Sequence, residues 1–252
     1  MRHLTRYLGY VAAAGLCLAG FIGTDAHAGI VITGTRAIYP AADREITIGL
    51  TNDEKKTPRL VQAWIDGGDA TISPDKADVP FHITPPVFRM EPGASQSLRV
   101  VYTKEPLPTD KESLFWLNVL EVPPKSTDAA DANVLQFAFR TRIKLFFRPD
   151  GLRGQAQDAP KALTWTLANN GSSSALQVNN PTPYYVSFQS VALAQGDKLD
   201  EASDDMSMVA PFGTLSISLK NKIATPAANA EVRFKTINDA GGFVPFTAPL
   251  KP

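Results

Sequence analysis

Residues 133–148, NVLQFAFRTRIKLFFR, carry the strongest strand pattern of the chain. Apolar residues recur at every second position, and glycine, proline and aspartate are absent, which is typical of a β-strand. The run is much longer than the average strand of about five to six residues. The apolar residues at odd-numbered positions are Leu135, Phe137, Phe139, Ile143 and Leu145, with Thr141 between, and the even-numbered positions include Gln136, Arg140, Arg142 and Lys144.

The apolar face of this run has two interpretations. In the first, the whole face covers the protein's own core. In the second, the face is bare and waits for another polypeptide. An apolar strand at an exposed edge promotes aggregation. A bare face therefore indicates a function in binding.

Shorter runs of the same kind lie before and after it. Apolar residues alternate with polar ones at Ile46, Ile48 and Leu50, at Leu98, Val100 and Tyr102, and at Leu215, Ile217 and Leu219. Turn-forming residues such as Asp66-Gly67-Gly68 and Glu91-Pro92-Gly93 separate the runs. We find no convincing amphipathic helix. The pattern predicts an all-β protein made of β-sandwiches.

The polar segment Asp150–Lys161 interrupts the alternation and contains glycine and proline, as domain boundaries commonly do. We therefore expect two immunoglobulin-like β-sandwich domains. The N-terminal domain would cover residues 29–149 and the C-terminal domain residues 150–252.

Residues 1–28 have the organisation of a secretory signal peptide. Arg2 and Arg6 precede an apolar segment at Leu8–Ile22, and Ala26-His27-Ala28 fits a signal-peptidase site. The apolar segment is shorter than the roughly 20 residues that span a bilayer. We expect export and cleavage near Ala28. The alternative is an uncleaved membrane anchor, and no stop-transfer pattern supports it.

Composition excludes several classes of function. The 25 Lys and Arg residues balance the 25 Asp and Glu residues, so the basic excess of a nucleic-acid-binding protein is absent. After cleavage the chain has no cysteine and a single histidine, His82, too few ligands for a zinc or thiol site. Phosphate-loop, dinucleotide and nucleophile-elbow motifs are missing. The acidic loop Asp197–Asp205 lacks the spacing of a calcium loop. We expect a protein that is not an enzyme and needs no metal or cofactor.

A series of short motifs resembles one family, the PapD-like periplasmic pilus chaperones of the chaperone–usher pathway. The motifs are Thr35-Arg36-Ala37, Gln62-Ala63-Trp64, Thr84-Pro85-Pro86, Glu91-Pro92-Gly93, Glu112-Ser113-Leu114-Phe115, Asn133-Val134-Leu135-Gln136, Ile143-Lys144-Leu145-Phe146-Phe147-Arg148-Pro149, Asn180-Pro181-Thr182-Pro183-Tyr184-Tyr185 and Asn238-Asp239. The short loop Pro123–Asn133 is similar to that of the short-loop group. The resemblance implies two immunoglobulin-like domains arranged as a boomerang with a cleft between them.

The resemblance also implies partners and site residues. The chain would stabilise pilus subunits, which are incomplete immunoglobulin-like folds, by donor-strand complementation, and would deliver them to an outer-membrane usher. Its donor strand would present Leu135, Phe137 and Phe139. Arg36 and Lys144 would bind the subunit's C-terminal carboxylate in the cleft. The alternative for these two residues is a pair of strand cations without a ligand.

Three further charged residues match an interdomain network of the family, namely Glu112, Arg148 and Asp239. The alternative is three unrelated surface charges. The Thr84-Pro85 bond is a candidate cis peptide. We expect some self-association of the free protein through its bare strand. A different class of protein, a secreted two-domain adhesion or carbohydrate-binding module, is the competing hypothesis, and it would not depend on Arg36 and Lys144.

Overall fold

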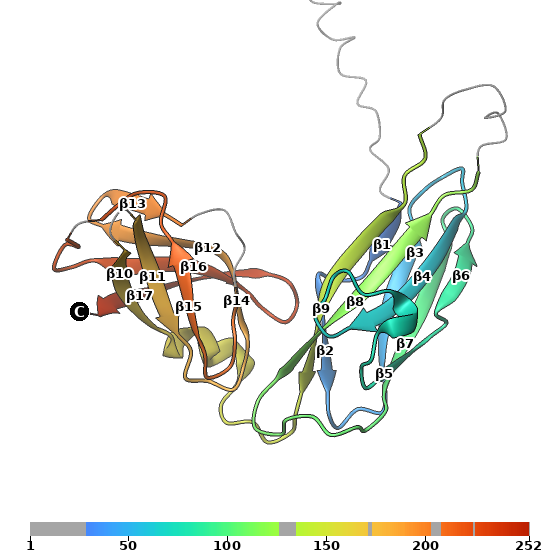
Figure 1. The fold of residues 1–252 in the computed structure, drawn as a ribbon, viewed down its shortest axis with the longest axis horizontal. Coiled ribbons are helices and arrows are strands. Elements are labelled where there is room, and N and C mark those ends of the chain that lie inside the picture. The colour runs from blue at the N-terminus through green and yellow to red at the C-terminus, as the bar shows by residue number, and fades with distance from the viewer. Residues whose placement is uncertain (1–28, 126–134, 171–172, 203–207, 224, 252) are drawn as a thin grey trace, which may run out of the picture.

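The computed structural model describes residues 29–125, 135–170, 173–202, 208–223 and 225–251 (Figure 1). β-strands dominate, and they form two separate bodies. The strands of the N-terminal body are β1 (Ile30–Ile32), β2 (Arg36–Pro40), β3 (Ile46–Asn52), β4 (Arg59–Asp66), β5 (Phe81–Thr84), β6 (Val87–Met90), β7 (Ser95–Tyr102), β8 (Ser113–Val122) and β9 (Phe139–Arg148). A short 3-10 helix, η2 (Pro74–Lys76), follows β4.

Two sheets form the N-terminal sandwich. One has the strand order β1-β3-β7-β5, and the other has the order β2-β9-β8-β4-β6. Because side chains alternate between the two faces of a strand, every second residue points between the sheets. These residues form the core, which includes Tyr39, Leu50, Leu98, Leu117 and Leu145. The prediction of an all-β sandwich is confirmed for this domain.

The C-terminal domain includes the helix η3 (Ala156–Ala162), which contributes Ala159 to a separate core around Trp165, Phe188 and Phe234. Its strands follow the hydrogen-bonded order β13-β12-β16-β17-β10-β11-β15, and β14 pairs with β12. The bounds are β10 (Thr164–Asn170), β11 (Ser173–Asn179), β12 (Val186–Gln195), β13 (Lys198–Glu201), β14 (Met208–Val209), β15 (Thr214–Ser218), β16 (Glu231–Ile237) and β17 (Phe243–Lys251).

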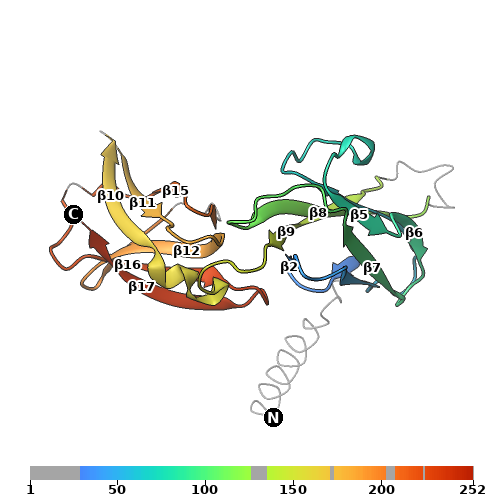
Figure 2. The same ribbon diagram turned by 90° about the horizontal axis from the view of Figure 1, so that it is seen from below.

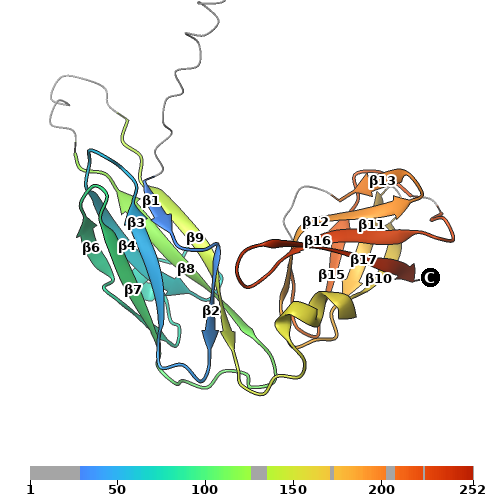
Figure 3. The ribbon, with the colours of Figure 1, turned by 180° about the vertical axis from the view of Figure 1, so that it is seen from behind.

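The two domains form an open V, and the chain passes from one to the other at its base, after β9 (Figures 1 and 3). Seen from below, the β16–β17 hairpin extends toward the N-terminal domain beside β2 (Figure 2). A hydrogen bond of 2.9 Å from Arg36 Nη1 to the Ile237 carbonyl joins this hairpin to β2. This arrangement agrees with the expected boomerang.

The first part of the chain changes sheets. β1 pairs with β3 in one sheet, and β2 pairs in parallel with β9 in the other. Gly34 lies in the connection with φ of +89°, a conformation that glycine adopts without strain. Because β2 covers only residues 144–148 of β9, the first half of β9 has β8 as its one neighbouring strand among the described residues.

β9 is shorter than the sequence run predicts. It begins at Phe139, and residues 135–138 have no strand pairing. The reason is the length of β8, because Glu121, which pairs with Phe139, is the next-to-last residue of that strand. Residues 126–134, and with them most of the loop before β9, lie outside the described part of the chain.

The Thr84-Pro85 bond is cis. Among the described residues, no helix has the length and apolar character needed to cross a membrane.

Candidate functional site

Arg36 and Lys144 lie opposite each other on two adjacent parallel strands, β2 and β9. Both side chains extend toward the C-terminal domain. Arg36 Nη1 donates a hydrogen bond to the Ile237 carbonyl on β16, and Lys144 Nζ lies 3.5 Å from Ser187 Oγ on β12. The structure therefore brings together the two cations that the sequence predicts for the cleft.

In the part of the chain that the structure describes, this pair of cations has no directly bound acid. Within the described residues, neither side chain forms an ion pair, and the buried Nε of Arg36 has no hydrogen-bond partner. Burial and the nearby positive charge of Arg36 lower the pKa of Lys144 to about 8. Burial also lowers the pKa of Arg36. Asp239 and Glu112 act on the pKa of Arg36 in the opposite direction. The site thus combines two neighbouring cations with an unused donor, and both features suit a carboxylate ligand.

A cavity of about 450 Å³ adjoins Arg36 between the two domains. Phe146 and Arg148 line it from the N-terminal domain, and Tyr185 and Ile237 line it from the C-terminal domain. The rings of Phe146 and Tyr185 pack 5.6 Å apart across the junction. The cleft therefore has a mixed lining, in which the two rings lie beside Arg36, Arg148 and the acidic residues Glu112 and Asp239.

The three predicted donor residues are solvent-exposed. Leu135 is 82% exposed, and Phe137 and Phe139 are each 62% exposed, whereas Ile143 and Leu145 on the same face of the run are buried. The face of the run thus passes from the core of the domain into solvent, with the polar Thr141 between the buried and the exposed apolar residues. Their part in binding a subunit stays a prediction.

Arg148 joins the other two predicted charged residues across the domain junction. Its Nε lies 2.7 Å from Glu112 Oε1, and its Nη1 lies 2.7 Å from Asp239 Oδ2. The second oxygen of Glu112 accepts a hydrogen bond of 2.8 Å from the Tyr185 backbone N–H. Glu112 is buried, and burial raises its pKa despite these partners. The buried carboxylate of Glu112 therefore binds Arg148 in its own domain and the backbone of Tyr185 in the other, which connects the two domains.

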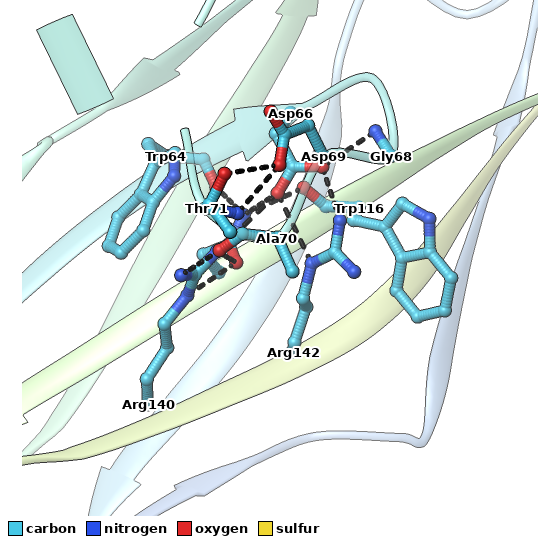
Figure 4. A network of polar contacts seen from close by, with 10 residues as sticks. Trp64, Asp66, Gly68, Asp69, Ala70, Thr71, Trp116, Arg140 and Arg142 are labelled. Atoms are coloured by element: carbon cyan, nitrogen blue, oxygen red, sulfur yellow. Dashed lines mark hydrogen bonds and ion pairs between the residues drawn. The ribbon is translucent and has the colours of Figure 1, made fainter. Parts of the chain in front are cut away.

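A second polar cluster lies on the outer face of the β2-β9-β8-β4-β6 sheet, and the sequence analysis did not find it. The carboxylate of Asp66 is fully buried there and binds Arg142 of β9 (Figure 4). In the sequence, Asp66 is only the first residue of a turn. The one available signal was the pair of arginines in the even-numbered positions of residues 133–148.

The three tryptophans differ in their positions. Trp165 lies in the C-terminal core. Trp64 and Trp116 lie instead on the outer face of their sheet, beneath Arg140 and Arg142. The neighbours Ala63, Ile65, Phe115 and Leu117 point between the sheets in their place.

The structure describes only part of the acidic loop Asp197–Asp205. Asp200 is buried and lies 3.2 Å from Lys198 Nζ, whereas residues 203–207 lie outside the described part. In the described ranges, no group of three or more His, Cys, Asp or Glu side chains could hold a metal ion.

Comparison with known proteins identifies the family. Residues 29–153 match the family described as "Pili and flagellar-assembly chaperone, PapD N-terminal domain". Residues 158–248 match "Pili assembly chaperone PapD, C-terminal domain". The chain belongs to the PapD family of pilus-assembly chaperones. The expected family is therefore confirmed.

Relatives within the PapD family match over almost the whole chain. The chaperone protein FimB/FhaD of Bordetella pertussis is 42% identical over 254 residues, which cover 99% of each chain. The probable fimbrial chaperone YadV of Escherichia coli K12 is 43% identical over 237 residues, which cover 93% of this chain and 94% of YadV. The YadV crystal structure covers 88% of this chain and 100% of its own, with a TM-score of 0.75.

A third PapD-like relative was solved with a partner. The SafB chaperone of Salmonella enterica, in complex with the SafA pilin, is 30% identical to this chain. The match covers 90% of this chain and 99% of that chain, with a TM-score of 0.71.

Proposed function

We propose that this protein is a periplasmic chaperone that binds pilus subunits by lending them the strand at residues 135–143, and that delivers them to an outer-membrane usher. Membership of the PapD family supports this function, and so does the pilin bound to the related SafB. The observation that carries the mechanism is the bare apolar face of Leu135, Phe137 and Phe139.

Two features make this segment suitable for strand addition. Its apolar side chains alternate, so they can enter successive pockets of an incomplete sandwich. On the side away from β8, the first half of β9 has no strand partner in the described part of the chain. Its backbone N–H and C=O groups can therefore pair with a strand of the subunit.

The cleft cations would fix the position of that added strand. A subunit whose C-terminal carboxylate binds Arg36 and Lys144 is held at one point on the edge of β9. The register then decides which side chains enter the subunit, because a shift of one residue turns every side chain to the opposite face. Charge-assisted hydrogen bonds to such a carboxylate contribute about 1.5–3 kcal/mol each.

Export to the periplasm would follow from the N-terminal segment, with cleavage near Ala28. Release would occur by exchange. A strand from a neighbouring subunit would replace the lent strand where it packs better against the groove. This step needs no cofactor.

The experiment is subunit capture in periplasmic extracts from cells that express the chaperone with its cognate pilin. Arg36→Ala and Lys144→Ala should each abolish most co-purification of the pilin. Arg99→Ala is the matched control, because Arg99 is an exposed strand arginine on the other sheet, paired with Glu45. Capture that is unchanged in both cleft variants would contradict the proposal.

A further inference from the structure

The first half of β9 lacks contacts that normally hold a strand in place. Residues 139–143 have β8 on one side and no strand on the other among the described residues. On the face that would cover a core, Phe139 and Thr141 are exposed. An edge strand that pairs with one neighbour and has one exposed face is expected to separate readily from its sheet. Contacts on the opposite face must therefore contribute much of its order.

Those contacts converge on one buried carboxylate. Arg142 places Nε 3.2 Å from Asp66 Oδ2 and bonds Oδ1 through Nη2 (Figure 4). Asn118 on β8 donates a hydrogen bond of 2.7 Å to Asp66 Oδ2, and the Gly68 N–H donates one of 2.7 Å to Oδ1. Arg140 Nη2 lies 3.6 Å from Asp66 Oδ2. We call Asp66, Asn118, Arg140 and Arg142 the outer clamp.

Arg140 is held in several directions at once. Its Nε donates to Asn118 Oδ1 at 2.9 Å, and its Nη1 donates to the Ala70 carbonyl at 2.6 Å. Its guanidinium lies 4.7 Å from the ring centre of Trp64. These contacts reach two other strands and a loop. They therefore restrict the movement of β9 at Arg140 relative to the rest of the sheet.

Arg142, two residues further along β9, is also stacked over a tryptophan. Its guanidinium lies 4.3 Å from the ring centre of Trp116. The outer clamp thus restrains two successive outward side chains of β9. Asp66 stays ionised in this cluster. Burial opposes its ionisation, but hydrogen bonds from Arg142, Asn118 and Gly68 hold its pKa below the ordinary value.

A buried ion pair is a costly way to stabilise a sheet, and apolar residues commonly serve as well. It does, however, specify one geometry. We propose that the outer clamp is a positioning device for strand donation, which keeps residues 139–143 extended before a subunit arrives. A strand that is already ordered loses less conformational entropy on binding. This inference rests on the proposed function, and Arg140 is its most testable member.

Hydrogen exchange on the free chaperone tests the clamp without any subunit. Arg140→Ala leaves Asp66 bound by Arg142 and Asn118, so no buried charge loses all its partners. We expect exchange at the 139–143 amides that bond to β8 to rise about tenfold, with other amides of the sheet unchanged. Arg99→Ala is the control and should leave these amides at the wild-type rate. Unchanged exchange in Arg140→Ala would overturn the proposal.

Association kinetics with the cognate pilin provide the second readout. Arg140→Ala should slow association about tenfold. Arg140→Lys retains the positive charge over Trp64 but loses the several N–H donors of the guanidinium, so it should recover only part of the association rate. If Arg140→Ala does not fold, hydrogen exchange and association kinetics are measured on Arg140→Lys instead, with Arg99→Lys as the matched control. Faster exchange with unchanged association would overturn the role in donation. If Arg36→Ala and Lys144→Ala both capture pilin normally, the proposed function itself fails, whatever the exchange result.

Discussion

Arg36 and Lys144 occupy paired positions on two neighbouring parallel strands, so two like charges are held side by side at the domain junction. Their hydrogen-bond partners, the Ile237 carbonyl and the Ser187 hydroxyl, are neutral. Asp239 and Glu112 offset part of the cost at Arg36, but burial and the charge of Arg36 still oppose the charged form of Lys144 in the free protein. A bound carboxylate would remove that cost, which makes the pair a source of binding free energy.

Binding of a subunit should depend on pH through Lys144. Its pKa of about 8 lies below the ordinary value because of burial and the charge of Arg36. Lys144 is charged at pH 7 and loses its proton as the pH rises past about 8. A bound carboxylate favours the charged form, so pilin affinity should decrease over this range. Dissociation constants measured from about pH 6.5 to 9.5 test this expectation.

Lys144→Arg is the control for the pH series, because an arginine stays charged throughout the range. Its pilin affinity should be nearly independent of pH. A decrease of equal size in the wild type and the variant would assign the titration to another group and contradict the account.

The same residue should reduce the stability of the free chaperone. The folded pKa of Lys144 is lower than its unfolded value, so the unfolded chain binds more protons between about pH 8 and 10.5, and stability should rise with pH there. At pH 7, Lys144→Met should raise the free energy of unfolding by about 1 kcal/mol while it weakens pilin capture. Urea unfolding of the free protein measures the change. A clear loss of stability would show that the cation is structurally required.

Substitution of the donor residues should weaken pilin binding and leave stability unchanged, whereas substitution of a buried residue further along the run should reduce stability. Phe137→Ser and Phe139→Ser should each weaken pilin binding by about 1.5–3 kcal/mol. Because both rings are exposed, the unfolding midpoint of the free protein should hardly change. Leu145→Ala, at a fully buried position, should instead cost about 2–5 kcal/mol of stability. Destabilisation by the two serine variants would mean that the face is covered in solution.

The domain junction should depend more on Glu112 than on Asp239. Glu112→Ala removes a buried partner of Arg148 and leaves the Tyr185 N–H unpaired. We expect a loss of about 2–3 kcal/mol and a wider range of interdomain angles. Asp239→Ala, at a half-exposed position, should cost less than about 1 kcal/mol. Denaturant unfolding and small-angle scattering test the two variants. Equal effects would contradict the central place of Glu112.

Alternation along residues 133–148 predicted which side chains share a face, but it left open whether that face is buried. Burial depends on neighbouring strands. The edge of β9 is free at residues 139–143 because β2 pairs only with residues 144–148, and the side chain of Phe139 is exposed in this half of the strand. The local sequence around Gly34 does not indicate which strands pair with β1 and β2, the strands on either side of this glycine.

The outer clamp was beyond prediction for a similar reason. Asp66 and Arg142 are 76 residues apart, and their contact depends on the register of β4, β8 and β9. Short motifs, in contrast, were sufficient to predict the family and the closeness of Arg148 to Glu112 and Asp239. The roles of Arg36, Lys144 and the donor residues stay predictions.

Hydrogen exchange of the chaperone with and without its cognate pilin tests the central claim most directly. If the strand is lent, binding should protect residues 135–143 strongly, and the C-terminal domain should change little outside its border with the cleft. Protection confined to loops of the C-terminal domain, with residues 135–143 exchanging as fast as in the free protein, would contradict the account.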